Sequence, residues 1–325
     1  MAVFLLPALL GGHLSPSLQL NPISLPLTEG RVPLILDGQV LGFDVDSGSA
    51  RSVAFYGPSY EKKYGEDNPC DDILSRKKRL VIYGDGDFYK YVDHTVTLRI
   101  DNRTIRDFKF GLVVKYRFES RLRGIPAPIL GISIGRASIP ETLLEQLKRR
   151  EAITTPSYSI HVKEQGPGVC GTLVLDDSDT TLDHSIAFSE RMLVEGSLAA
   201  SLWPLRLFDS LGNQLEDRRT SGKAKPALVD TGATSLYIPR KDFQKILDVT
   251  WETMRKQETS FGIEKSKQLL CDDRWVRMVR KEALPYLPTL AYRIGELPYT
   301  IDIRIEPKHY VHSCEALCCQ NGYRP

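Results

Sequence analysis

One short pattern occurs twice in this chain, once in each half, and it limits the folds available to the chain more than any other feature does. Each copy is an apolar run that ends in Asp, then Ser or Thr, then Gly. A single tripeptide of this kind is usually just a turn, because Asp, Ser and Gly are turn formers. Two copies, 184 residues apart and each after an apolar run, predict two related lobes. The copies are Asp46-Ser47-Gly48 and Asp230-Thr231-Gly232.

The chemistry of paired carboxylates explains why such a pattern would occur twice. Two carboxylates held a few ångströms apart do not both ionise, so one keeps a proton while the other acts as a base. A water molecule between Asp46 and Asp230 would then become a nucleophile at acid pH. The glycine of each copy would let the loops approach closely, and the hydroxyls of Ser47 and Thr231 would hold the two loops together.

The two loops differ in one hydroxyl just after the tripeptides. Ser49 follows the first tripeptide, and its hydroxyl is expected to hydrogen-bond the outer oxygen of Asp46. Its counterpart in the second loop is Ala233, which has no hydroxyl to offer Asp230. The sequence therefore predicts different surroundings for the two carboxylates.

Most of the remaining chain consists of short alternating apolar runs that end at Gly, Asp, Asn or Pro, which is typical of β-strands and turns. Residues 96–100 and 171–175 are examples. Two amphipathic helices are expected, at residues 140–150 and 239–247, each with a proline in its first turn. The sequence thus predicts an all-β, mainly antiparallel protein.

Composition and motifs exclude several classes of function. Lys and Arg number 43 against 41 Asp and Glu, so the chain lacks the basic surface that nucleic-acid binding usually needs. The most apolar stretch, residues 1–12, is too short to span a bilayer. None of the six histidines lies in an HExxH pattern or forms an obvious triad with a GxSxG serine, which disfavours a metalloprotease or a serine hydrolase. No metal, cofactor or nucleic-acid partner is expected.

Around the two tripeptides the sequence resembles the pepsin-like aspartic proteases. The spacing from Gln39 to Asp46 is the family's spacing from glutamine to catalytic aspartate. The ordered series of similar segments is more specific than any one of them. It runs over roughly residues 28–315 and comprises LVIYGDGD at 80–87, ILGI at 129–132, GTLVLDDSD at 171–179 and SLWPL at 201–205.

The resemblance implies a bilobal fold of two pseudo-symmetric β lobes with a cleft between them. The implied boundaries are a signal or leader segment at 1–27, a first lobe at 28–165 and a second lobe at 166–325. The implied flap covers the bound peptide with Tyr83, Gly84, Asp85 and Gly86. The implied second-lobe disulfide joins Cys271 and Cys314, and the remaining cysteines stay unassigned: Cys70, Cys170, Cys318 and Cys319.

The sequence also departs from the family pattern. Val53 stands where the family usually has a tryptophan bonded to the flap tyrosine, so closure by Tyr83 is expected to be less secure. Residues 126–128 replace the usual Asp-Gly before the ILG segment. After Cys314 no second ILG-like segment follows, and before Asp46 there is no room for a family-length inhibitory prosegment.

Two functions fit these features. The first is a monomeric endopeptidase that cuts peptides and proteins at acid pH, with apolar side chains beside the cut as the default preference. The second is a catalytically impaired binding or inhibitor-type protein with the same fold. The apolar N-terminus, the cysteines and a sequon at Asn102 favour a secreted or endo-lysosomal or vacuolar location. A misassigned start, or a first strand packed into the core, would explain the N-terminus equally.

Overall fold

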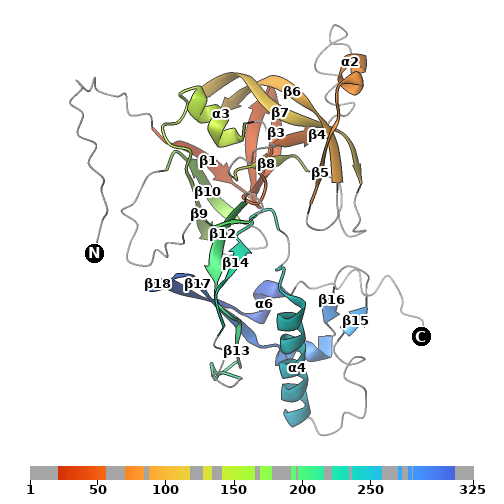
Figure 1. Cartoon of the computed structure of the whole chain (residues 1–325), viewed down its shortest axis with the longest axis vertical. Coiled ribbons are helices and arrows are strands. Elements are labelled where there is room, and N and C mark those ends of the chain that lie inside the picture. The colour runs from red at the N-terminus through yellow and green to blue at the C-terminus, as the bar shows by residue number, and fades with distance from the viewer. Residues whose placement is uncertain are drawn as a thin grey trace, which may run out of the picture.

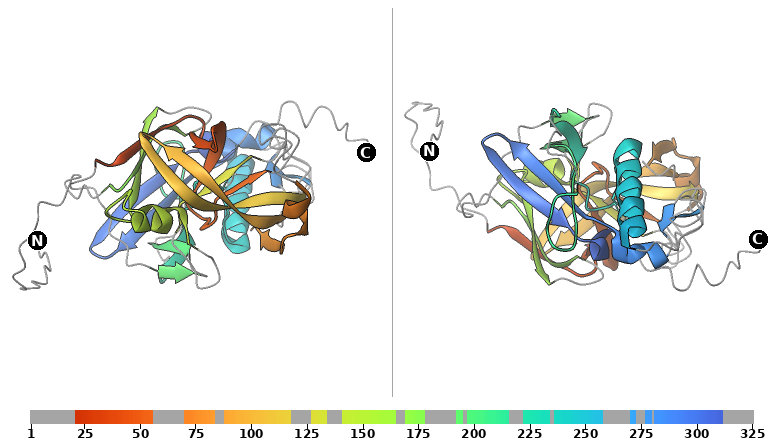
Figure 2. Two further views of the ribbon diagram at one scale, coloured as in Figure 1. Left: turned by 90° about the horizontal axis from the view of Figure 1, so that it is seen from above. Right: turned by 90° about the horizontal axis from the view of Figure 1, so that it is seen from below.

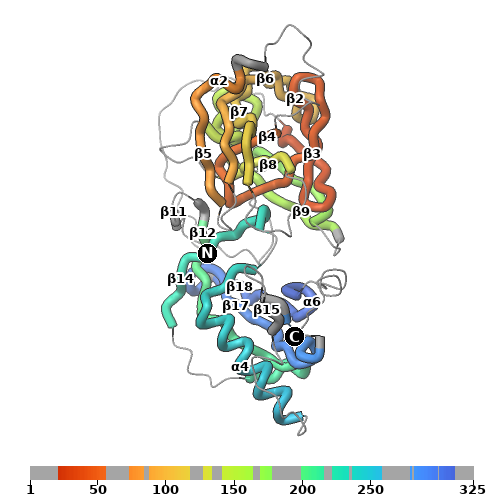
Figure 3. The backbone as a smooth tube through the Cα atoms, turned by 90° about the vertical axis from the view of Figure 1, so that its right-hand side faces the viewer, coloured from red at the N-terminus to blue at the C-terminus, as the bar shows by residue number. Residues whose placement is uncertain are grey.

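A computed structural model shows a molecule of two lobes stacked along its long axis (Figure 1). The first lobe contains the strands up to β10 with helices α2 and α3, and the second lobe contains the later elements. The side view in Figure 3 shows the same division. The structure describes residues 21–55, 70–83, 88–117, 127–133, 141–164, 169–177, 192–194, 197–215, 222–233, 236–257, 270–272, 277–279 and 281–311.

The first lobe is built on a seven-stranded sheet in the order β2-β3-β8-β4-β7-β6-β5, which curls until β2 also pairs with β6. Most neighbours are antiparallel, but β8 runs parallel to β3, and β4 runs parallel to β7. The all-β prediction is therefore confirmed in this lobe. The strands are β2 (Arg31–Leu36), β3 (Gln39–Asp46), β4 (Val53–Phe55), β5 (Arg79–Ile82), β6 (Phe88–Ile100), β7 (Arg103–Arg117) and β8 (Ile129–Gly131).

The β2–β3 hairpin sets the register of the strand that carries Asp46. Its two-residue turn is Asp37-Gly38, and both residues have positive φ, 46° and 84°. A two-residue turn of this hand requires positive φ at both positions, and Asp-Gly is a favoured pair there. The Asp37 carboxylate also accepts a hydrogen bond of 2.7 Å from the backbone N–H of Thr97, which ties the turn to β6.

A second, three-stranded sheet has the order β1-β10-β9, with strands β1 (Ile23–Leu27), β9 (Tyr158–Glu164) and β10 (Cys170–Leu175). It changes two boundaries expected from the sequence. Residues 23–27 were assigned to the leader, yet their alternate side chains are buried in the first lobe's core. Residues 170–175 were assigned to the second lobe, yet Leu173 and Leu175 join that same core.

Helix α3 (Leu143–Arg149) closes one end of this core, while α2 (Cys70–Ser75) lies near the other end. The sequence placed the start of α3 at residue 140, but the helix begins after Thr142. Thr142 accepts from the backbone N–H of Glu145, and the Glu145 side chain accepts from the backbone N–H of Thr142. This reciprocal capping box fixes the start of the helix because it satisfies two otherwise unpaired N–H groups.

The second lobe centres on a six-stranded sheet with the path β11-β12-β17-β13, to which β14 and β18 add by pairing with β12 and β17. A separate pair, β15 and β16, lies beside it. The elements are β11 (Met192–Val194), β12 (Ser197–Leu202), β13 (Arg206–Phe208), β14 (Lys225–Leu228), β15 (Leu270–Asp272), β16 (Arg277–Val279), η1 (Lys281–Tyr286), β17 (Thr289–Glu296), β18 (Tyr299–Ile305) and α6 (Pro307–Tyr310).

Helix α4 (Arg240–Gln257) stands beside the β17–β18 hairpin (Figure 2). The sequence predicted that it ends at Leu247, ten residues too early. The missed part contains few apolar residues, but Thr250 and Met254 continue the buried face. The hydroxyl of Thr250 donates to the carbonyl of Ile246 at 2.7 Å, so this polar side chain is buried without losing a partner.

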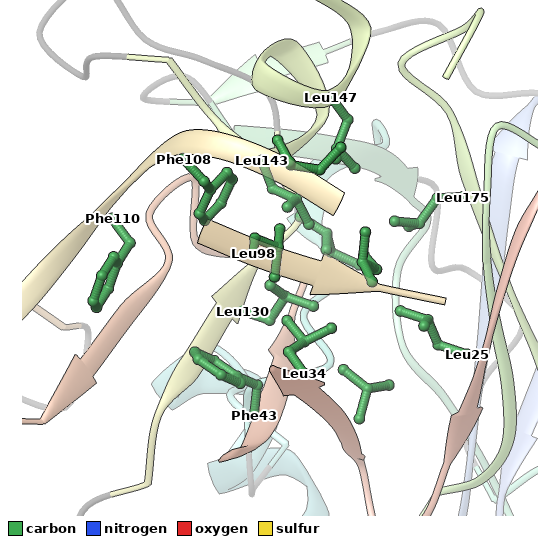
Figure 4. Close-up of a cluster of buried hydrophobic side chains, with 14 of the residues drawn as sticks. Leu25, Leu34, Phe43, Leu98, Phe108, Phe110, Leu130, Leu143, Leu147 and Leu175 are labelled. Carbon is green, nitrogen blue, oxygen red and sulfur yellow. The ribbon is translucent and has the colours of Figure 1, made fainter. Parts of the chain in front are cut away.

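The described residues of the two lobes form cores of different size. A continuous apolar cluster fills the first lobe, where Leu143 and Leu147 of α3 pack with strand residues such as Leu98 and Leu130 (Figure 4). The described part of the second lobe has two smaller clusters, one around Leu207 and Leu290 and one under α4. Among the described residues, no helix combines the length and the hydropathy needed to cross a bilayer.

Candidate active site

The two aspartate loops meet at the junction of the lobes. Asp46 ends β3, and Asp230 follows β14 by two residues. A Cβ atom on Gly48 would lie 2.5 Å from Oδ2 of Asp230, and one on Gly232 would lie 2.6 Å from Cγ of Asp46. Real Cβ atoms do not make contacts this short, so each loop needs glycine where it faces the opposite carboxylate. The structure therefore brings together the two carboxylates that the sequence pairs.

Four hydrogen bonds join the loops in a nearly symmetrical pattern. The backbone N–H of Ser47 donates to Oγ1 of Thr231 at 3.1 Å, and the backbone N–H of Thr231 donates to Oγ of Ser47 at 3.0 Å. Each hydroxyl in turn donates across the junction, Ser47 to the carbonyl of Val229 at 2.8 Å and Thr231 to that of Val45 at 2.7 Å. The expected contact between these hydroxyl residues is present.

The two carboxylates have different surroundings. Asp46 is only 8% exposed, and its Oδ1 accepts from the backbone N–H groups of Gly48 and Ser49, both at 2.9 Å. Asp230 is half-buried and accepts at 2.8 Å from the N–H of Gly232. Burial first, and then the charge of Asp230 and a hydrogen bond with it, raise the pKa of Asp46 to about 7. Burial and the neighbouring Asp230 therefore favour the neutral form of the Asp46 carboxyl.

The hydroxyl of Ser49 does not form the hydrogen bond with Asp46 that the sequence predicted. It donates to the carbonyl of Arg51 and accepts from the N–H of the same residue, both at 3.2 Å. The bond to Asp46 comes instead from the backbone N–H of Ser49. A backbone donor needs no hydroxyl, so the difference between Ser49 and Ala233 bears less on the carboxylates than the sequence indicated.

Tyr83 directly follows β5, and it lines the same cavity as Asp46. Residues 84–86, expected in the flap, lie outside the described residues. The Tyr83 ring packs edge-on against Tyr89, with ring centroids 5.1 Å apart. Fully buried Val53 belongs to the same cluster. Among the described residues no group hydrogen-bonds the buried Tyr83 hydroxyl, which agrees with the absence of a tryptophan at position 53.

A cleft of about 1110 Å³ runs past both carboxylates. Tyr83 and Ile129 of the first lobe line it, and Leu202 and Tyr237 are among its lining residues from the second lobe. Clefts of this size and mixed lining take extended or bulky ligands. The dyad, the hairpin and the cleft together form a site that could hold a peptide against two coupled carboxylates.

The family model for eukaryotic aspartyl proteases matches residues 60–319 of this chain. The chain belongs to this family. The match contains Asp230 but begins after Asp46. Asp46 is therefore paired with the second loop by the hydrogen bonds and close contacts between the loops, and not by the family match.

Comparison with solved structures gives the same fold. The aspartic proteinase from Irpex lacteus superposes with a TM-score of 0.56 over 88% of this chain and 79% of that chain. The two sequences are 16% identical, so the likeness concerns the fold alone. A search of curated proteins returned no match to this chain. The bilobal, all-β architecture expected from the sequence is confirmed.

One feature of the protease cleft was not anticipated from the sequence. Asp44 lies two residues before Asp46, so both side chains are on the same face of β3. Asp44 pairs with Arg31 of β2, with Nε and Oδ1 2.6 Å apart, and both residues line the cleft. The alternation of β3 could have revealed this. The wall beside Asp46 thus carries a charge pair where apolar side chains were the default expectation.

The two aspartate loops differ in how their strands are supported. In the first lobe β8 runs beside β3, and the backbone of Arg51 lies so close that a Cβ on Gly131 would be 2.4 Å from its carbonyl oxygen. Within the described part of the chain, β14 pairs with β12 alone. Leu228 and Val229 remain 43% and 60% exposed.

The expected disulfide cannot be compared with the structure. Cys271 lies in β15, but its side chain and the whole of Cys314 are outside the described residues, as are the side chain of Cys70 and residues 318 and 319. Cys170 is a free thiol whose sulfur lies 3.5 Å from the backbone nitrogen of Glu29. The Cys271–Cys314 bond stays a prediction.

Proposed function

We propose that this protein is an aspartic endopeptidase whose catalytic residues are Asp46 and Asp230. The observation that carries the proposal is the pair of cross-bonded loops, which hold the buried carboxyl of Asp46 close to that of Asp230. Paired carboxylates are costly to hold together, and such groups are characteristic of sites that use them.

The proposed reaction uses the two carboxyl groups in opposite roles. Ionised Asp230 removes a proton from a water molecule, whose oxygen forms a bond to the carbon of the peptide carbonyl. Protonated Asp46 donates its proton to the carbonyl oxygen, which gives a neutral tetrahedral diol. Asp230 then gives its proton to the amide nitrogen while Asp46 takes one back from the diol. The C–N bond breaks, and the dyad returns to its starting state.

The rest of the cleft would position the substrate. An extended peptide fits between the lobes, and the β5–β6 hairpin with Tyr83 would cover it and limit access of bulk water. Ser47, Gly48, Thr231 and Gly232 would fix the separation of the two carboxyl groups. Ser49 would contribute through its backbone N–H.

The test is hydrolysis of an unfolded protein substrate from pH 3 to 7 by the full chain. We expect a bell-shaped pH dependence whose limbs belong to the pair. Asp46→Asn, Asp230→Asn and the double variant should each lose roughly 10³-fold or more, to nearly the same residual rate, because the two residues act as a unit. Asp101→Asn, at an exposed turn, is the matched control. Retained activity in Asp46→Asn would sink the proposal.

A binding or inhibitor-type protein is the second candidate. Two features favour it because they leave the site less firmly closed: the Tyr83 hydroxyl has no hydrogen-bond partner among the described residues, and Val229 is exposed. Tight binding of unfolded peptides without any cleavage between pH 3 and 7 would identify this function. Cleavage that needs both aspartates would exclude it.

We also propose that the protein acts outside the cytosol, in a secreted or endo-lysosomal or vacuolar setting, as a monomer. The sequon residue Asn102 lies in the exposed turn between β6 and β7, which supports glycosylation there. Loss of mass on enzymatic deglycosylation would test it.

A further inference from the structure

Strand β3 presents a second carboxylate to the cleft, beside the one that belongs to the dyad. Phe43 and Val45 are 2% and 3% exposed and lie in the core of the first lobe, where Figure 4 shows Phe43. Successive side chains of a strand point to opposite faces, so Asp44 and Asp46 face away from this core. Both line the cleft. Residues two apart within a strand are separated by about 7 Å, so Asp44 lies close to the reacting group.

The neighbouring strands give Asp44 two different sides. The register of β2 and β3 places Arg31 opposite Asp44, with Nε and Oδ1 2.6 Å apart. On the other side, β8 runs parallel to β3 and places Ile129 beside Asp44. Arg31 and Ile129 also line the cleft. The wall next to the dyad therefore offers an apolar side chain, a carboxylate and, one strand beyond, a guanidinium.

The ion pair leaves part of the Asp44 carboxylate open to a ligand. Arg31 contacts it through Nε and only at Oδ1. Among the described residues, no other side chain bonds this carboxylate. The side chains of Arg31 and Asp44 are 55% and 41% exposed. Exposed ion pairs are weak, so a charged group of a bound substrate can compete for Asp44.

The charges on this wall favour a cation over an anion. Arg31, Asp44 and Asp46 are the charged residues that line the cleft from the described part of the first lobe. Arg31 and Asp44 cancel, while a dyad that shares one proton keeps one negative charge. A cation between Asp44 and the dyad is attracted by both, whereas an anion there is repelled by both. Lysine and arginine also carry a long aliphatic stem, which can pack on Ile129.

We infer that the cleft selects peptides with a lysine or arginine directly beside the bond that is cut, and that Asp44 is the residue that recognises this side chain. This rests on the proposed endopeptidase function and adds a substrate class to it. Arg31 holds the Asp44 carboxylate while the cleft is empty and competes with the substrate for it. Because the wall is open to solvent, the preference is moderate and depends on salt.

The test uses matched synthetic peptides with one cleavable core. At each of the two positions beside the cut, one peptide carries lysine, one carries acetyl-lysine and one carries glutamate. Acetyl-lysine keeps the aliphatic stem and removes the charge. At one of the two positions we expect the lysine peptide to exceed the acetyl-lysine peptide about fivefold in kcat/KM. This ratio should fall toward one in roughly 0.5 M salt.

Variants assign the ratio to Asp44. Asp44→Asn should reduce it to about one, because asparagine keeps the size and removes the charge. Arg31→Gln should raise it, because the competing guanidinium is gone. Asp93→Asn is the matched control and should leave the ratio unchanged, because Asp93 forms a comparable exposed ion pair with Arg79 at 2.9 Å but is not among the residues that line the cleft.

Two results would overturn the inference and leave the protease function intact. The first is a ratio of lysine to acetyl-lysine near one in the parent protein, or one that survives Asp44→Asn. The second is fastest cleavage of the glutamate peptide together with loss of that preference in Arg31→Gln, which would assign this wall to an acidic side chain.

A binding measurement separates this inference from the proposed function. Fluorescence anisotropy with labelled, uncut peptides on the Asp46→Asn protein does not need catalysis. Tighter binding of the lysine peptide that is lost when Asp44→Asn is added would support the basic preference even if no peptide were ever cleaved. Equal affinity for the lysine and acetyl-lysine peptides would refute it.

Discussion

Asp46 couples the chemistry of the site to the stability of the whole chain. Its pKa is raised from about 4 in an unfolded chain to about 7 in the fold, because of burial and Asp230. Below about pH 4 it is protonated in both states. Between about pH 4 and 7 it ionises only when unfolded, which favours unfolding. The contribution of this group to the free energy of unfolding is therefore greatest at low pH and is lost as the pH rises to about 7.

This linkage predicts how Asp46→Asn changes the pH dependence of stability. In the native protein, the free energy of unfolding contributed by Asp46 falls by about 1.4 kcal/mol per unit of pKa shift. The fall adds up to roughly 4 kcal/mol between pH 4 and 7. Asparagine does not titrate, so the variant should lack this slope. Urea unfolding of both proteins at several pH values gives the difference curve, in which the groups outside the Asp46–Asp230 pair cancel. Parallel curves for the two proteins would contradict the raised pKa.

At the scale of elements, a buried glutamine joins α3 to the first sheet. Gln146 is 1% exposed, its Oε1 accepts from the N–H of Lys109 and its Nε2 donates to the carbonyl of Lys109, both at 2.8 Å. The side chain thus satisfies both backbone groups of a residue in β7. The apolar pattern of α3 highlights its leucines and gives no sign of this role, which depends on where β7 passes.

Gln146→Leu should therefore destabilise the protein although it adds an apolar side chain to a core. It leaves the partly buried N–H and carbonyl of Lys109 without the Gln146 partner, at a cost of about 1 to 3 kcal/mol for the two groups. Gln244→Leu, on the exposed face of α4, is the matched control and should change stability by less than about 0.5 kcal/mol. Chemical denaturation measures both. Equal effects would show that the bonds to Lys109 contribute nothing.

The β5–β6 hairpin yields a second prediction at this scale. Burial is the main cause that raises the pKa of Tyr83 well above its ordinary value, so the hydroxyl stays neutral. None of the described residues forms a hydrogen bond with it. Tyr83→Phe should therefore leave the melting temperature nearly unchanged. Its kcat/KM should stay within about threefold of that of the parent. Tyr83→Ala removes the packing against Tyr89 and should lower both. If Phe is as damaging as Ala, the hydroxyl acts on the bound substrate.

At the scale of the whole molecule, the lobes should differ in stability. The first core contains 26 buried apolar residues, whereas the described clusters of the second lobe contain six and three. Buried apolar area is the main favourable contribution to folding, so the second lobe should unfold first. The cross-bonds between Ser47 and Thr231 are few compared with either core and would not make the transitions coincide.

The position of the tryptophans makes this testable in the native sequence. All three, at residues 203, 251 and 275, belong to the second half of the chain. Tryptophan fluorescence therefore reports on the second lobe, while far-ultraviolet circular dichroism reports on both. In a urea titration the fluorescence transition should come at lower urea than the main dichroism transition. Superimposable curves would show that the lobes unfold as one unit.

The sequence was informative wherever short-range patterns are sufficient. The repeated Asp-Ser/Thr-Gly loops predicted the dyad because glycine and a hydroxyl are needed at fixed positions next to each carboxylate. Alternating apolar runs predicted the strands because the side-chain period of a strand is two. The all-β bilobal fold follows from these local rules together with the family resemblance, which extends beyond both loops.

Only the tertiary structure decided features that depend on contacts distant in sequence. Gln146 bonded Lys109, and β10 joined the first core, because each outcome depends on which strand passes nearby. The ion pair of Arg31 and Asp44 arises in the same way, because the register of β2 and β3 places the two residues opposite each other. Local sequence fixes which groups an element offers, and the packing of the lobes fixes which of those groups meet.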